Sequence, residues 1–162
     1  MTSTPPLPHP GVKFPPPFLF LLGLGLAWLL ETRLVRIRLI GGTMSPRTFE
    51  IAGVALLLAG LVLMLWGLYT FARVRTGIIP HRPATKIVDH GPYRFSRNPM
   101  YTGMSTAYLG GALIMNSGWA LILLPVVMLA LYSFVIRKEE RYLSSAFPED
   151  YASYRARVRR WL

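Results

Sequence analysis

Two clusters of polar residues that could carry chemistry stand out in an otherwise apolar chain. The first is the basic segment of residues 87–101, where cations, aromatic rings and turn residues follow each other closely. The second is the run Arg137-Lys138-Glu139-Glu140-Arg141, which holds two of only seven acidic residues in the chain. A polar segment between apolar spans is a poor linker and a plausible site for a charged ligand.

The dipeptide Asn98-Pro99 predicts the start of a helix, because Asn is a preferred N-cap and Pro is favoured at the first helical position. A helix N-terminus offers backbone N–H groups and partial positive charge, which suit a carboxylate or a phosphate. Arg94 and Arg97 add charge beside it. The alternative is an ordinary capped helix with arginines that reach toward the membrane surface, and these residues alone favour that alternative.

Tyr93 and Tyr101 bracket this predicted cap, with Phe95 between them. Tyrosines at a membrane interface usually serve as anchors. The functional alternative is an aromatic wall against a heterocycle, with a hydroxyl group as donor.

Glu139 and Glu140 are adjacent, so on a helix they point about 100° apart and at most one faces a given pocket. One interpretation is an ion-paired helix surface, in which both carboxylates balance their basic neighbours. The other is a carboxylate that neutralises a cationic ligand, and Glu139 is preferred for it because it lies one residue closer to the membrane.

The histidines and cysteines narrow the chemistry further. His9, His81 and His90 have no metal-ligand spacing, so no metal site is expected, although a histidine could act as a general base. The chain has no cysteine, which excludes disulfides and thiolate catalysis. The Gly23-Leu24-Gly25 segment lies inside an apolar span and is interpreted as a helix-packing motif.

The apolar runs that must position these residues predict an all-α, polytopic transmembrane protein with about four membrane spans. The turn Asn116-Ser117-Gly118 predicts that the last two spans form a helical hairpin, with a kink at Pro125 and close contacts through the small residues of the third span. The predicted spans cover residues 18–30, 49–72, 99–115 and 119–136.

The basic residues predict the orientation of these spans. The net charge is +11, and 14 of the 18 Lys and Arg residues fall on the side that holds both termini, the 73–97 loop and the tail. This excess places both termini in the cytoplasm and indicates a membrane partner rather than nucleic acid. Residues 1–17 contain seven prolines and predict an irregular arm before a single membrane domain of residues 18–162, with no cleaved signal expected.

The combined pattern resembles the isoprenylcysteine carboxyl methyltransferase family, as a bacterial-type member. Residues 91–103 are similar to the family motif G-x-Y-x-x-x-R-H/N-P-x-Y-x-G. The tail resembles the family's second block, with Glu139-Glu140, then Phe147-Pro148-Glu149-Asp150-Tyr151, Tyr154, Val158 and Trp161. The likeness covers roughly residues 75–162, and the first two spans are only generically similar.

The resemblance implies S-adenosylmethionine as cofactor, bound inside the membrane domain within residues 75–162. Two departures stand out: Asn98 replaces the histidine of the eukaryotic enzymes, and the family's substrate-binding arginine falls on Val135, for which Arg137 is the candidate substitute. By position, the implied cofactor residues are Lys86, Ile87, Val88, Tyr93, Asn98, Pro99, Met100, Tyr101 and Glu139.

The implied reaction is methyl transfer to a lipophilic acceptor, such as a carboxylate of the isoprenylcysteine kind, at a bacterial inner membrane. A carboxylate needs no base, whereas an amine, as in phosphatidylethanolamine, needs one. The candidate catalytic residues are Arg97, Glu140 and His90, with Asp89 as a further candidate base. The alternatives are a phospholipid N-methyltransferase, a non-catalytic protein that binds anionic lipid or a partner, and a protein that resembles sterol reductases; oligomeric state stays open.

Overall fold

The computed structural model describes residues 11–12, 15–39, 46–74 and 86–161, and this part of the chain contains helices and no strands. The predicted all-α fold is therefore confirmed for the described residues. In chain order the elements are α1 (Pro16–Arg33), α2 (Pro46–Val74), the short 3-10 helix η1 (Gly91–Arg94), α3 (Pro99–Ile114), α4 (Gly118–Leu131), the π-helical turn η2 (Tyr132–Ile136), α5 (Arg137–Ala146) and α6 (Pro148–Arg157).

Within the described ranges, two helices are long and apolar enough to cross a membrane. They are Arg47–Val74 and the continuous helix Gly118–Ala146, which runs through α4, η2 and α5. The four-span topology and the cytoplasmic position of both termini stay predictions. Most of the predicted proline-rich arm lies outside the described residues, but Val12 is described and is buried in the core.

Helices α2 and α3 pack antiparallel through glycines spaced seven residues apart. A Cβ on Gly60 would collide with backbone atoms of Gly103 and Ala107, and one on Gly53 would lie 2.9 Å from the carbonyl oxygen of Gly110. These contacts require glycine because the helix backbones themselves touch. The predicted packing role of the small residues in the third span is confirmed.

Helix α1 packs on the hairpin formed by α3 and α4. A Cβ on Gly23 would lie 2.6 Å from Val127 and 3.1 Å from the ring of Tyr108. The Tyr108 hydroxyl donates to the carbonyl of Ala120 at 2.9 Å, which ties α3 to α4. The packing interpretation thus holds for Gly23 but is wrong for Gly25, whose added Cβ would meet nothing within 4 Å because it faces outward.

The predicted turn between α3 and α4 is confirmed. Asn116 adopts a positive φ of 51°, and Ser117 caps α4 by accepting from the backbone N–H of Ala120 at 3.1 Å. Helix α4 includes Pro125, where the predicted kink stays a prediction, and the π-helical turn η2 follows the end of α4. A π-helical turn shifts the phase of the residues that follow it, which here are those of α5.

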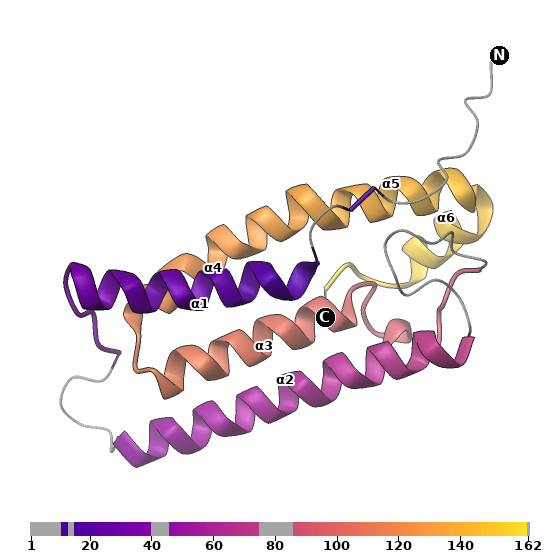
Figure 1. The fold of residues 1–162 in the computed structure, drawn as a ribbon. Helices are drawn as coiled ribbons and strands as arrows, with labels where there is room; N and C mark the ends of the chain where they lie inside the picture. Colours follow the sequence, from indigo (N-terminus) through magenta and orange to yellow (C-terminus); the bar gives the residue numbers. More distant parts are fainter. Residues whose placement is uncertain (1–10, 13–14, 40–45, 75–85, 162) are drawn as a thin grey trace.

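At one end of the helices the chain folds back on itself. Figure 1 shows α5 and α6 above η1 and the end of α2, with the yellow C-terminal segment beside the start of α3. The same end therefore holds the segment that precedes α3 and the tail that follows α4, as the sequence predicts.

Candidate functional site

The segment before α3 and the C-terminal tail meet at this end of the molecule through direct hydrogen bonds. The backbone N–H of Arg97 donates to the carbonyl of Arg159 at 2.9 Å, and the Tyr154 hydroxyl donates to the carbonyl of Tyr93 at 2.8 Å. Residues some 60 positions apart in sequence are thus brought together, as the sequence predicts.

The centre of the site is a bond between Tyr101 and Glu139. The Tyr101 hydroxyl donates to Glu139 Oε1 at 2.8 Å. Tyr101 lies in the first turn of α3 and is buried, and Glu139 lies in the first turn of α5. The hydrogen bond orients the carboxylate of Glu139 toward the start of α3.

Tyr93 completes one wall of the site. Its side chain is 5% exposed, and its ring packs edge-to-face on Phe71 of α2 with the centroids 4.9 Å apart. Its hydroxyl has no hydrogen-bond partner among the described residues and lies where α2 has Gly67, 3.4 Å from the position of an added Cβ. Burial, with Glu139 and Tyr154 nearby, raises the pKa of Tyr93 far above its usual value, so the hydroxyl keeps its proton as a donor.

Glu140 faces away from Glu139 and is bound by two arginines. Arg160 donates from Nε to Glu140 Oε1 and from Nη2 to Oε2, both at 2.9 Å, and Arg97 Nη1 donates to Oε1 at 3.1 Å. The two glutamates thus have different partners, as the helix geometry predicts, and the cofactor role of Glu139 stays a prediction. The predicted partners of Glu140, its neighbours Arg137 and Arg141, were wrong. Both arginines are exposed, and Glu140 instead binds Arg160 of the tail, which folds back toward α5.

Arg97 is largely buried where the segment before α3 meets α5 and α6. Its side chain is only 10% exposed, and Nη1 also donates to the Tyr151 hydroxyl at 3.2 Å. Its Nε is buried and has no partner among the described residues.

Asn98 stands before α3 as predicted, but its side chain does not cap the helix. Its Nδ2 donates to the carbonyl of Arg160 at 3.0 Å, so the amide holds the tail instead. The prediction that this side chain caps the helix was wrong, because its amide group hydrogen-bonds to a carbonyl from a distant part of the chain instead. Pro99 is the first residue of α3 as predicted, and Met100 faces Gly67 of α2.

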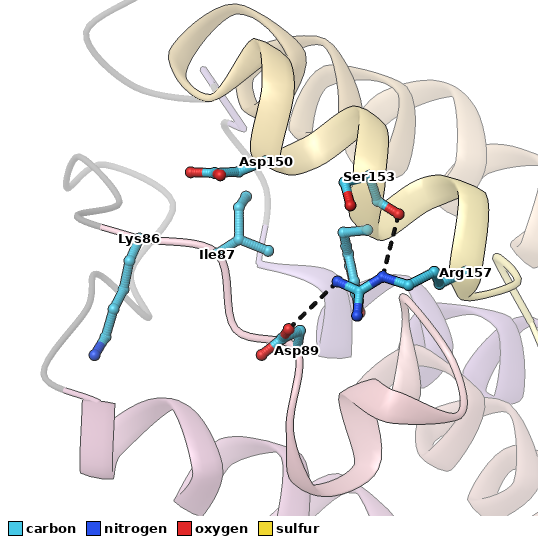
Figure 2. A pocket seen from close by; sticks show the side chains of 7 residues that line it. Lys86, Ile87, Asp89, Asp150, Ser153 and Arg157 are labelled. Atoms are coloured by element: carbon cyan, nitrogen blue, oxygen red, sulfur yellow. Dashed lines mark hydrogen bonds and ion pairs between the residues drawn. The ribbon is translucent and has the colours of Figure 1, made fainter.

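The residues before η1 lie beside α6, around a pocket of about 240 Å³ (Figure 2). Asp89 forms an exposed ion pair with Arg157 at 3.6 Å, and Tyr154 also lines the pocket. Among the predicted cofactor residues, Lys86 and Ile87 line this pocket and Val88 is buried.

Two further predicted residues are exposed. His90 lies just before η1 with an exposed side chain, and Arg137 is exposed at the start of α5, while Val135 is fully buried. Among the described residues, neither His90 nor Arg137 forms a side-chain hydrogen bond with Tyr101 or Glu139. In the described ranges, no group of three His, Cys, Asp or Glu side chains could hold a metal ion.

Two residues that contribute contacts to the candidate site were not identified from the sequence. Arg160 is one of several basic tail residues, and its pairing with Glu140 depends on how the tail folds back. Gly67 is the third of the glycines at 53, 60 and 67, so the seven-residue spacing was the signal that could have found it.

Comparison with known proteins agrees with this architecture. The family model "Phospholipid methyltransferase" matches residues 49–150, from α2 to the first turn of α6. The cobalt-zinc-cadmium resistance protein CzcN of Cupriavidus metallidurans is 35% identical over 80 residues, which are 49% of this chain and 37% of that protein. The protein-S-isoprenylcysteine O-methyltransferase of Saccharomyces cerevisiae is 32% identical over 72 residues, 44% of this chain and 30% of that protein.

A third relative, an uncharacterized protein of Haemophilus influenzae, is 33% identical over 63 residues, 39% of this chain and the whole of that protein. This chain thus spans only about a third of the length of the Cupriavidus and yeast relatives. No solved structure matches.

The matched family and the yeast relative confirm the resemblance to membrane methyltransferases. With the family model covering well over half of its length, this chain belongs to the phospholipid methyltransferase family.

Proposed function

We propose that the chain is an S-adenosylmethionine-dependent methyltransferase that acts on a lipophilic acceptor at the membrane. One observation carries the proposal: the bonded pair of Tyr101 and Glu139 at the start of α3, next to the buried Tyr93 hydroxyl. Family membership supports methyl transfer, and the chemistry of these three side chains supports this donor.

The residues present fit S-adenosylmethionine. Glu139 would neutralise its ammonium group or its sulfonium, and the start of α3 would bind its carboxylate. The Tyr93 hydroxyl is a buried donor without a partner in the described structure, which a polar ligand group would satisfy. The pocket lined by Lys86 and Ile87 adjoins these residues through Tyr154, which bonds to Tyr93. When bound, the cofactor supplies an electrophilic methyl group on a positively charged sulfur.

The arrangement favours an anionic oxygen nucleophile, such as a carboxylate. The buried Nε of Arg97, which has no partner among the described residues, would bind and orient such a group. Among the candidate bases, Glu140 gives both oxygens to arginines and Asp89 pairs with Arg157. Because a carboxylate needs no base, the engagement of these two acids does not hinder it.

A phospholipid amine is the second candidate, and the name of the matched family favours it. An amine arrives protonated and needs a base. Of the candidate bases, His90 is the one whose side chain is not held by an arginine, so an amine acceptor would depend on it. His90→Gln then separates the two acceptors: methylation of an amine falls, and methylation of a carboxylate does not.

Calorimetric titration of the full chain in detergent with S-adenosylhomocysteine tests the proposal. Saturable binding that Glu139→Gln weakens is the expected result. A monodisperse, folded sample without detectable binding contradicts it. Binding of reduced nicotinamide cofactor in place of S-adenosylhomocysteine would instead favour a protein that resembles sterol reductases.

A further inference from the structure

We infer that the C-terminal residues 158–161, here called the strap, hold the segment before α3 in its binding conformation, with Arg160 and Asn98 as positioning residues. The strap follows α6 as non-helical chain and lies beside the start of α3 (Figure 1). This inference rests on the proposed function, because what the strap positions is the proposed cofactor site.

Three consecutive residues of the segment donate to the backbone of the strap. The N–H of Arg97 donates to the carbonyl of Arg159 at 2.9 Å. The carbonyl of Arg160 accepts from Ser96 Oγ at 3.2 Å and from Asn98 Nδ2 at 3.0 Å. Ser96 and Asn98 are both buried, so the loss of these acceptors would leave buried donors unsatisfied.

The side chain of Arg160 fixes the other side of the strap. It binds Glu140 with two bonds of 2.9 Å, which is the fork geometry that lysine cannot reproduce. Its guanidinium also lies over the ring of Tyr132 in η2, 5.2 Å from the centroid. Trp161 packs against the hydrophobic core. The strap is therefore bonded to the segment on one side and to the η2–α5 helix on the other.

The strap therefore links the two parts of the proposed site. Asn98 immediately precedes α3, which carries Tyr101, and Glu140 immediately follows Glu139. The shared contact of Arg97 and Arg160 with Glu140 fixes the segment relative to α5. A loosened strap would therefore change the separation of Tyr101 and Glu139 without removing either of them.

Two measurements on the full chain in detergent test the inference. Arg160→Ala is expected to weaken S-adenosylhomocysteine binding about tenfold at a temperature where the variant stays folded, as for the loss of one charge-assisted contact. Arg160→Lys should restore part of the affinity. Hydrogen exchange of peptides that contain the Arg97 amide should become faster in Arg160→Ala and in Asn98→Asp, which replaces the amide donor with a carboxylate of the same size.

Arg141→Ala is the matched control, since it removes an exposed arginine one residue after Glu140. It should leave both readouts at their native values. Unchanged exchange at Arg97 in Arg160→Ala would overturn the inference. Faster exchange with native affinity would also overturn it, because the strap would then stabilise the fold without positioning the site. If the native chain bound no S-adenosylhomocysteine, the proposed function would fail, and the exchange data would separately decide whether the strap holds the segment.

Discussion

Replacing Glu139 by glutamine should weaken cofactor binding without weakening the fold. The amide oxygen of glutamine can still accept the 2.8 Å bond from Tyr101, so the change removes the negative charge and little else. The loss of a charge-assisted contact at a partly buried site is worth about 1–3 kcal/mol of binding free energy, or roughly 5- to 150-fold in affinity. Titration with S-adenosylhomocysteine and thermal unfolding in detergent measure the two quantities.

Glu140→Gln is the informative comparison, because the residue is adjacent but its partners differ. It should lower the free energy of unfolding by about 1–3 kcal/mol, since its pairs with Arg97 and Arg160 are partly buried. Any loss of cofactor affinity caused by Glu140→Gln should disappear when Arg160 is also replaced by alanine. The loss caused by Glu139→Gln should persist in that background. Native affinity in Glu139→Gln, or equal losses of stability in both variants, would refute the reasoning.

Three further substitutions test the packing that supports the site, all by thermal unfolding in detergent. Gly60→Ala should destabilise the chain by about 1–3 kcal/mol because the helix backbones collide, and Gly25→Ala, which faces open space, should not; similar effects at both would contradict the glycine contact. Gly91→Ala should cost about 1–2 kcal/mol, since its φ is +60°, and a neutral result would mean that the turn can rearrange. Tyr154→Phe should cost about 1–3 kcal/mol by leaving the buried carbonyl of Tyr93 without its 2.8 Å partner, and an unchanged midpoint would show that this bond contributes nothing.

The helices were predictable because they depend on local patterns. Apolar runs and Pro99 predicted where helices would lie, and the start of α3 agrees to the residue. The π-helical turn was not predictable, because residues 132–136 have no proline or glycine to mark it. Val135 and Ile136 in this turn are fully buried in the hydrophobic core.

The residues that the structure brings together at the candidate site were more predictable than their contacts. The likeness to a known motif identified Tyr93, Tyr101 and Glu139, and helix geometry separated Glu139 from Glu140. The partner of Glu140 was not predictable, since Arg160 reaches it only after the chain turns back through α6. The side chain of Asn98 had a plausible local role as a helix cap. It instead hydrogen-bonds to the carbonyl of Arg160, which approaches only after the same turn of the chain.

Methyl transfer itself is the most direct test of the central claim. Membranes that contain the chain would be incubated with S-adenosylmethionine labelled in the methyl group, and the lipids extracted and treated with base. We predict label in the lipid extract that base releases as a volatile product, as a methyl ester would, and its loss in Glu139→Gln membranes. Base-stable label in phospholipid would instead indicate N-methylation. Absence of lipid-soluble label above that of membranes lacking the chain, across extracts that supply both carboxylate and amine lipids, would contradict the account.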